Sequence, residues 1–295
     1  MTASKPPASS SPHWRGVVWR IVRLPLVVYA GVLIAMMFLE NSLIFFPSRH
    51  PEGFWNPLGM GHEDVWFTAA DGTKLHGWFV PHDKPRAVAL FAHGNAGNIT
   101  DRIERLEFLK KQGIAVFAFD YRGYGRSEGA PNEAGVLQDA RAARRWLTER
   151  TGVAESHIVL IGESLGGAIL VDLAAKDGAG GLILESTFSS LPDVAAHHYR
   201  WLPVRLLMRS RLNALEQIGN YHGPLLWSHG TADEVVPYAL GRRLFEAANE
   251  PKVGIDRPGC GHNGPPHPED YKPYVVALDE FLNRVAAGQG ETASD

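Results

Sequence analysis

The stretch that decides the fold is HIVLIGESLGGAILV, residues 157–171 of 295. It begins with a short apolar run rich in β-branched residues, which is the composition of a buried strand. It ends with small and apolar residues that suit a packed helix. Between them lies Gly-x-Ser-x-Gly, whose glycines allow a turn so sharp that Ser164 takes a strained backbone conformation. The stretch therefore predicts a strand, a tight turn that exposes a serine hydroxyl, and a helix that begins directly behind it.

The same five-residue pattern occurs a second time, at Gly125–Gly129, so the pattern alone does not identify a reactive serine. The second copy follows a loop-like Tyr-Arg-Gly-Tyr and runs into Ala-Pro-Asn. No strand leads directly into it and no helix leaves it. We interpret Ser127 as a loop residue and Ser164 as the nucleophile.

The composition is that of an ordinary globular protein and excludes several classes. The chain has 45% hydrophobic and 21% charged residues, and its 295 residues allow one large α/β domain or two small ones. A formal net charge of −3 gives no bulk attraction to nucleic acid. The single cysteine, Cys260, excludes a disulfide framework and a cysteine-rich zinc site. The 13 histidines contain no His-Glu-x-x-His pattern, and we expect neither a metal nor another cofactor.

The N-terminal segment has the composition of a membrane anchor. We expect a disordered tail over residues 1–16 and a transmembrane anchor over 17–46, since an uncharged run, 24–39, has apolar flanks on both sides. A buried helix of the domain is one alternative, but the run lacks a polar face. A cleaved signal peptide is another, although no clear Ala-x-Ala site follows. The positive-inside rule puts the N-terminus in the cytoplasm and the main domain outside, in the periplasm of a bacterium. The basic residues before the run are Lys5, Arg15, Arg20 and Arg23.

Apolar runs and helical patterns alternate through residues 47–286, which we predict to be one domain. Such units indicate a mostly parallel sheet covered on both faces, with an antiparallel hairpin at one edge. The insert at about 186–220 predicts a small helical cap, and 287–295 a disordered tail. Predicted strands are 64–68, 75–80, 87–92, 114–119, 158–161, 181–184, 225–229 and 252–256; predicted helices are 101–112, 133–150, the segment after Ser164, 238–249 and 271–285.

A serine nucleophile needs a base, and the base needs an acid that orients it. Asp233 comes just after the predicted strand 225–229, and His262 comes just after the predicted strand 252–256. The order Ser, Asp, His, with each residue in a loop after a strand, predicts a Ser164-His262-Asp233 triad. Glu234 and Glu185 remain alternatives for the acid, and His229 and His267 remain alternatives for the base.

A tetrahedral intermediate also needs two preorganised N–H donors for its oxyanion. The backbone N–H of Leu165, directly after the nucleophile, is one candidate. The loop 91–98 after the predicted strand 87–92 supplies the other, for which we select the N–H of Asn95. We expect His93 to brace this loop rather than to act as the base.

Together these residues make the chain resemble the α/β-hydrolase superfamily, and more narrowly its membrane-anchored, α/β-hydrolase-domain-containing serine hydrolases. This resemblance implies a doubly wound, eight-stranded sheet and activity on acyl esters or thioesters, including lipids and palmitoylated proteins. The Pro-rich segment 264–268 departs from the family's pattern. The matching motifs are LIFFP (43–47), HGNAGN (93–98), DYRGYGRS (120–127), GESLGG (162–167), HGTADEVVP (229–237) and GHN (261–263).

We therefore predict a serine hydrolase that forms an acyl-enzyme. Its expected substrate is a small-molecule or lipid ester or thioester with an apolar acyl group, because an anchor would hold the site near lipids. Two alternatives stay open: a peptidase or amidase with the same triad, and a non-catalytic, membrane-anchored binding protein on a hydrolase scaffold.

Overall fold

The computed structural model describes residues 14–264 and 271–292. Internal contacts divide the chain into two units, one ending at Glu40 and the other starting at Asn41. Helix α1 spans Trp14–Ile44, so its last residues belong to the second unit. The helix starts inside the predicted tail 1–16, and residues 1–13 of that tail lie outside the described part of the chain.

Helix α1 has the length and composition needed to cross a membrane. Its segment Ile21–Ile44 comprises 24 residues with a mean hydropathy of 2.2, and its most apolar part is not buried inside the structure. At 1.5 Å per residue this segment is about 36 Å long, against roughly 30 Å for a bilayer's hydrocarbon core. A membrane anchor and a secretion signal share these properties, so length and composition do not separate the two.

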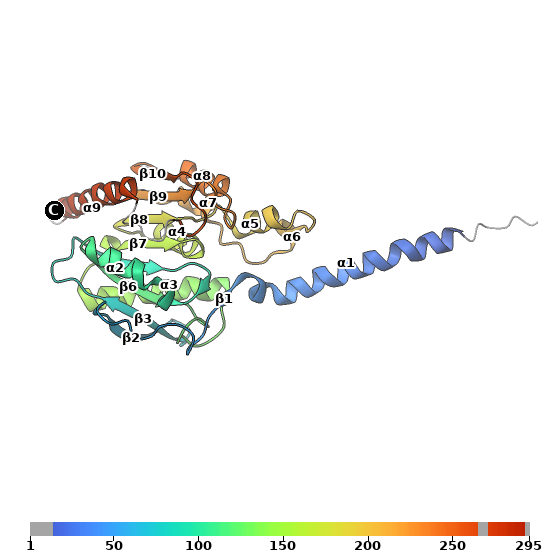
Figure 1. Ribbon diagram of the computed structural model, residues 1–295, viewed down its shortest axis with the longest axis horizontal. Helices are drawn as coiled ribbons and strands as arrows, with labels where there is room; N and C mark the ends of the chain where they lie inside the picture. Colours follow the sequence, from blue (N-terminus) through green and yellow to red (C-terminus); the bar gives the residue numbers. More distant parts are fainter. Residues whose placement is uncertain (1–13, 265–270, 293–295) are drawn as a thin grey trace, which may run out of the picture. The chain divides into compact units, whose positions relative to one another are not determined.

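A sheet of eight strands, counted over the described residues, forms the centre of the second unit. Its strands lie in the order β10-β9-β8-β7-β4-β6-β3-β2. Figure 1 labels seven of them, from β10 at the top of the view to β2 at the bottom. Strand β3 runs antiparallel to both β2 and β6, and the other neighbouring pairs are parallel. The predicted mostly parallel sheet with an edge hairpin is therefore confirmed. The strands are β2 (Glu63–Thr68), β3 (Lys74–Val80), β4 (Ala87–Ala92), β6 (Ile114–Asp120), β7 (Val159–Glu163), β8 (Gly181–Glu185), β9 (Leu225–Gly230) and β10 (Lys252–Arg257).

Helices cover both faces of the sheet, and strand side chains alternate between two cores. In β4, Leu90 packs into one core and Phe91 into the other. Every residue of β4 and β6 is buried, which explains why these strands are continuous apolar runs in the sequence. The predicted doubly wound arrangement is confirmed. Helices α3 (Glu133–Thr151), α4 (Leu165–Asp177) and α8 (Tyr238–Ala247) contribute to the first core, and α2 (Ile103–Lys111) and α9 (Lys272–Thr292) to the second.

Several helix ends differ from their predicted positions, and two of these differences have a clear physical cause. The predicted helix 101–112 begins earlier, as the 3₁₀ helix η1 (Ile99–Arg102), because the Asn98 side chain accepts a hydrogen bond from Thr100 N and caps it. Helix α9 continues through the first six residues of the predicted tail 287–295, because extending a formed helix costs far less than starting one. Residues 293–295 lie outside the described part.

The insert 186–220 is helical, as predicted, and consists of short pieces. These are α5 (Leu191–His198), α6 (Val204–Leu207) and α7 (Ala214–Ile218). Ala214 and Ile218 of α7 are buried, whereas Leu206 of α6 is 84% exposed. The cap thus packs on its own domain through α7 and presents apolar side chains to solvent around α6.

A second, two-stranded sheet joins the chain after α1 to the loop that follows β4. Strand β1 (Phe46–Pro47) pairs in parallel with β5 (Ala96–Gly97). The predicted anchor 17–46 therefore extends two residues past the helix, which ends at Ile44. The physical reason is that Phe45, although apolar, is only 3% exposed and packs into the domain's first core.

Candidate active site

Ser164 lies on a strained turn between β7 and α4. Its backbone has φ 49° and ψ −113°, a combination that side-chain-bearing residues rarely adopt. A Cβ on Gly162 would lie 2.5 Å from the Cα of Gly167, and a Cβ on Gly166 would lie 2.1 Å from the carbonyl oxygen of Ala92. Both positions of the motif therefore require glycine, because a side chain at 162 would collide with the first turn of α4 and one at 166 with strand β4.

Neighbouring backbone groups hold this turn in place. The N–H of Ser164 donates to the carbonyl oxygen of Glu185 at 2.8 Å, and the Thr187 hydroxyl donates to the carbonyl oxygen of Ser164 at 2.7 Å. Leu165 is the first residue of α4, so its N–H belongs to the first turn and has no partner within the helix. The serine thus stands at a helix N-terminus, where negative charge is stabilised.

Asp233 and His262 come together from loops that follow neighbouring strands. The Nδ1 of His262 lies 2.8 Å from Oδ2 of Asp233, while the N–H groups of Val235 and Val236 donate to Oδ1 at 2.9 and 2.8 Å. Burial by itself raises the pKa of Asp233, but hydrogen bonds from His229 and His262 outweigh it and hold that pKa well below its usual range. Asp233 is therefore a carboxylate at neutral pH and fixes the ring of His262.

Ser164 and His262 line the same cavity, whose volume is about 370 Å³. The carbonyl oxygen of His262 accepts a hydrogen bond from Ser186 Oγ at 3.0 Å, and Arg257 Nη2 donates to that hydroxyl at 2.7 Å. The structure thus brings three of the predicted site residues close together: Asp233 contacts His262, and His262 lines the same cavity as Ser164.

The alternative acids and bases have other surroundings. His229 also contacts Asp233 Oδ2, at 3.1 Å, but it is fully buried and donates to Val236 O at 2.9 Å. Glu234 is exposed, and Glu185 pairs with Arg105 at 2.6 Å. His267 and most of the Pro-rich segment lie outside the described residues.

The predicted oxyanion loop lies against the nucleophile. A Cβ added to Gly94 would sit 3.6 Å from Ser164 Cβ, and Asn95 lines the cavity beside Ser164. The loop's neighbour His93 is fully buried, with Nδ1 2.7 Å from Gly94 O and Nε2 3.3 Å from Asp120 Oδ1. His93 therefore has the bracing position expected for it.

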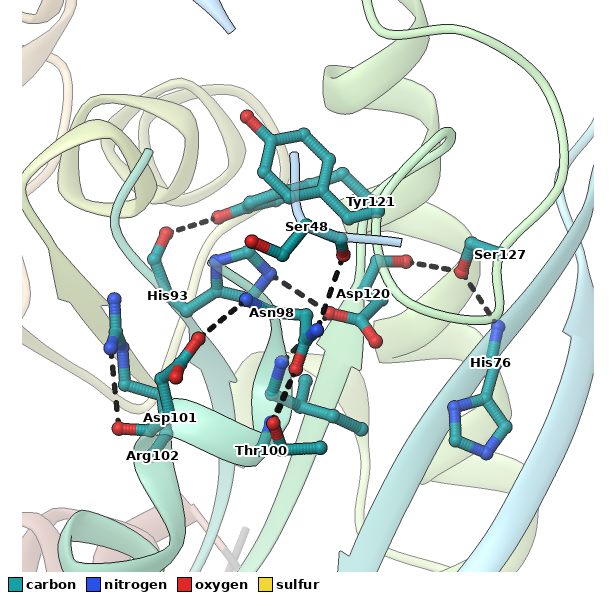
Figure 2. A network of polar contacts seen from close by, with 12 residues as sticks. Ser48, His76, His93, Asn98, Thr100, Asp101, Arg102, Asp120, Tyr121 and Ser127 are labelled. Carbon is teal, nitrogen blue, oxygen red and sulfur yellow. Dashed lines mark hydrogen bonds and ion pairs between the residues drawn. The ribbon is translucent and has the colours of Figure 1, made fainter. Parts of the chain in front are cut away.

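Figure 2 shows how far this bracing network extends. The Tyr121 hydroxyl donates to His93 O at 2.8 Å, and the Ser127 hydroxyl donates to Asp120 O at 2.7 Å. Ser127 also accepts from the N–H of His76 at 2.9 Å. The serine of the second Gly-x-Ser-x-Gly copy thus ties a loop to a strand, in keeping with its interpretation as a loop residue.

The cavity also contains a charged cluster that the sequence did not predict. Glu163 lies 3.2 Å from Arg102 Nε and 3.7 Å from Arg105 Nε, and burial raises the pKa of Glu163 against the opposing effect of Arg102. Arg105 also contacts Glu185 and the Tyr274 hydroxyl, at 2.6 and 2.9 Å. Arg102 and Arg105 are three residues apart, the spacing of neighbours on one face of a helix, but this spacing alone does not indicate a site.

Several donors on residues that line this cavity have no hydrogen-bond partner among the described residues. They include the buried atoms Nη1 of Arg105, Nε of Arg257 and Oγ of Ser228. In that same part of the chain, no group of three or more His, Cys, Asp or Glu side chains has the arrangement of a metal site. The polar and charged lining of the cavity suits a hydrogen-bonding group of a ligand.

Comparison with known proteins gives the following similarities. Residues 83–215 match the model of a family described as serine aminopeptidase, S33. An uncharacterised protein of Mycobacterium tuberculosis is 39% identical over 268 residues, covering 90% of this chain and 95% of that protein. An α/β-hydrolase domain-containing protein of Arabidopsis thaliana is 35% identical, with coverage of 75% and 79%. A protein of Saccharomyces cerevisiae named as an uncharacterised membrane protein is 30% identical, with coverage of 78% and 86%.

Among solved structures, an esterase of Pyrococcus furiosus superposes with a TM-score of 0.67. The match covers 82% of this chain and 98% of the esterase at 23% identity. At that identity the likeness concerns the fold alone, and it agrees with the sheet order and helix layers described above.

Proposed function

Because this chain belongs to the α/β-hydrolase family and is a hydrolase, we propose that it cleaves carboxylic esters or thioesters through a serine acyl-enzyme. Ser164 is the nucleophile, His262 the base and Asp233 the acid that orients the base. The observation that carries the proposal is the strained Ser164 in one cavity with His262, whose Nδ1 lies 2.8 Å from Asp233.

The proposed reaction has two halves. Ser164 Oγ attacks the carbonyl carbon while its proton moves to Nε2 of His262, which is the ring nitrogen not facing Asp233. The C–O or C–S bond then breaks, and the same proton goes to the departing alcohol or thiol. Water attacks the acyl-enzyme with His262 again as base, which releases the acid and restores Ser164.

The N–H groups of Asn95 and Leu165 are the proposed oxyanion donors. Leu165 begins a helix, and Asn95 lies in the loop packed against Ser164. Removing one such donor typically costs about 10²- to 10³-fold in kcat. The backbone conformation of the loop 94–97 is therefore as important to the proposed rate as the side chains of the triad.

The charged lining of the cavity bears on the substrate. Arg102, Arg105 and Glu163 surround the space beside Ser164, and they favour hydrogen-bonding groups over hydrocarbon. The cavity thus fits the polar part of an ester or thioester. The apolar acyl chain that we inferred from membrane anchoring would lie outside this cavity.

Amide hydrolysis is the second candidate function. The matched family is described as a serine aminopeptidase, and the same three residues serve acyl transfer from amines as well as from alcohols. Parallel assays of p-nitrophenyl esters and aminoacyl p-nitroanilides distinguish the two. Higher kcat/KM on the anilides would favour the peptidase. Failure to react with either substrate or with any serine-directed probe would favour the non-catalytic binding protein.

The proposal includes a retained membrane anchor with a cytoplasmic N-terminus. Helix α1 has the required length, and the yeast relative is named a membrane protein. Phe45 is buried in the domain, so cleavage at the helix end would cut into the domain itself. Alkaline carbonate washing should leave the full-length protein in the membrane fraction. Release of a shortened protein would indicate a signal peptide.

The direct test replaces the nucleophile. Ser164→Ala should abolish hydrolysis of short p-nitrophenyl esters and labelling by a fluorophosphonate probe. Ser127→Ala, a change to the serine of the other pattern copy, is the matched control and should keep both activities. Hydrolysis by Ser164→Ala at the wild-type rate contradicts the assignment.

A further inference from the structure

The segment directly after the apolar helix is bound to the proposed oxyanion loop at several points. Phe46 and Pro47 pair in parallel with Ala96 and Gly97, and the N–H of Ser48 donates to Gly97 O at 3.1 Å. No spacer separates the helix end from this contact, since α1 ends at Ile44 and β1 begins at Phe46. The loop beside Ser164 therefore has one of its edges covered by the chain that leaves the helix.

The side chain of Asn95 makes the closest connection between the two segments. Its Nδ2 donates to the carbonyl oxygen of Ile44, and its Oδ1 accepts from Phe46 N at 3.2 Å and from the Tyr124 hydroxyl at 2.9 Å. Ile44 is the last residue of α1, where helix carbonyls have no partner within the helix. Asn95 thus caps the end of the apolar helix while Tyr124, which is fully buried, holds it from the domain side.

These contacts act on the residue whose N–H we assigned to the oxyanion. The backbone amide and the side-chain amide of Asn95 belong to one residue, so fixing the side chain at three points restricts the orientation of the backbone N–H. Gly94, on its other side, contributes no side chain that could hold the loop. The geometry points to Asn95 as a positioning residue, whose side chain clamps the oxyanion loop to the end of the membrane helix.

The chemistry of the clamp explains why an amide is needed. Ile44 O requires a donor, whereas Phe46 N and the Tyr124 hydroxyl both require an acceptor. Asparagine offers both within one short side chain, and aspartate of the same size offers only the acceptor. An Asn95→Asp chain would place a carboxylate against the helix-end carbonyl, and the loop would move away from it.

The clamp implies that the helix end is a structural part of the proposed active site. This inference rests on the proposed function, because it assigns a purpose to the loop only if Ser164 forms an oxyanion intermediate. A displacement of Ile44 would be transmitted to Asn95 by a single hydrogen bond. Detachment of the helix end should therefore lower the rate of the chemical step without altering the triad.

The test compares full-length variants in detergent micelles, with active sites counted by fluorophosphonate titration. We expect Asn95→Asp and Asn95→Ala to lower kcat per titrated site by about 10- to 100-fold, which is less than complete loss of an oxyanion donor. Affinity for a trifluoromethyl ketone, which forms an oxyanion adduct, should fall by a similar factor, while KM changes little. Tyr124→Phe removes one of the three contacts, keeps the ring packed, and should cause a smaller decrease in both.

Asn249→Asp is the matched control. Asn249 is also half-buried and donates through Nδ2 to two backbone carbonyls, of Gly219 and Tyr221, at 2.7 and 2.9 Å, but it does not line the cavity. This variant should lose thermal stability while keeping wild-type kcat and trifluoromethyl ketone affinity.

Two outcomes would overturn the inference, and they differ from failure of the proposed function. The clamp is wrong if Asn95→Asp and Tyr124→Phe keep wild-type kcat per site while Ser164→Ala is inactive. The clamp is also wrong if Asn95→Asp and Asn249→Asp both lose kcat per titrated site in proportion to their loss of thermal stability. If Ser164→Ala remains active, the proposed function itself has failed.

Discussion

Replacing Asp233 by asparagine tests the proposed triad at its most constrained member. The carboxylate receives four donors: Val235 N and Val236 N at Oδ1, and His229 Nε2 and His262 Nδ1 at Oδ2. An asparagine can keep the two backbone contacts with its carbonyl oxygen, but its NH₂ group then faces both histidines. His262 must turn its Nδ1 into an acceptor, which puts the remaining proton on Nε2 and leaves the ring unable to accept the proton of Ser164.

The expected loss of kcat comes from other triad enzymes, and the expected loss of stability comes from these contacts. The same substitution in enzymes with a Ser-His-Asp triad lowers kcat by about 10⁴-fold, equivalent to about 5 kcal/mol in the barrier. The fold should survive, because His229 keeps its bond to Val236 O and the net loss is about one hydrogen bond, roughly 1 kcal/mol. A loss of that size lowers Tm by about 2–4 °C in a domain of this length.

The assay measures kcat on a p-nitrophenyl ester by burst kinetics, together with Tm by calorimetry. Glu234→Gln is the control, since Glu234 is adjacent in sequence but exposed, and it should keep wild-type kcat. Asp233 is not the orienting acid if Asp233→Asn stays within tenfold of wild-type kcat, or if Glu234→Gln is the variant that loses activity.

Three further predictions concern stability and the local fold. The folded-state pKa of Asp233 lies below the unfolded value of about 3.9. The Asp233 carboxylate therefore contributes its full share to the free energy of unfolding above about pH 3.9, and this share is lost as pH falls through the folded pKa. Acid unfolding monitored by circular dichroism should accordingly depend less on pH in Asp233→Asn. Gly166→Ala puts a Cβ 2.1 Å from Ala92 O and should cost about 1–3 kcal/mol or more, with loss of esterase activity; an unchanged urea midpoint would contradict the steric argument. Ser127→Ala removes the bridge between His76 N and Asp120 O and should cost about 1–3 kcal/mol in urea unfolding without lowering kcat per titrated site.

Local sterics and strand order made much of the fold predictable. The run before Ser164 is apolar because its strand is buried on both faces, and glycine at 162 and 166 is required by contacts within a few ångströms. The loops carrying Asp233 and His262 follow parallel strands, whose carboxyl ends meet at one edge of the sheet. Each of these features produces a recognisable pattern within a short stretch of sequence.

Contacts between short segments that lie far apart in the sequence could not be predicted. The pairing of 46–47 with 96–97 involves two residues on each side, too few to create a periodic pattern. The asparagine that caps α1 resembles any loop asparagine in the sequence, and so its side-chain role was not predicted. Likewise, Arg105 and Glu185 become partners only when α2 and β8 come together in the fold.

Mapping the acylated residue tests directly whether Ser164 forms an acyl-enzyme. The full-length protein is mixed with a p-nitrophenyl ester, quenched in acid during the burst phase, digested and analysed by mass spectrometry. We expect the acyl mass on the peptide containing Ser164, and no acyl mass on that peptide in His262→Ala under the same conditions. Acylation of the Ser127 peptide instead, or full turnover with no acylated serine, would contradict this assignment.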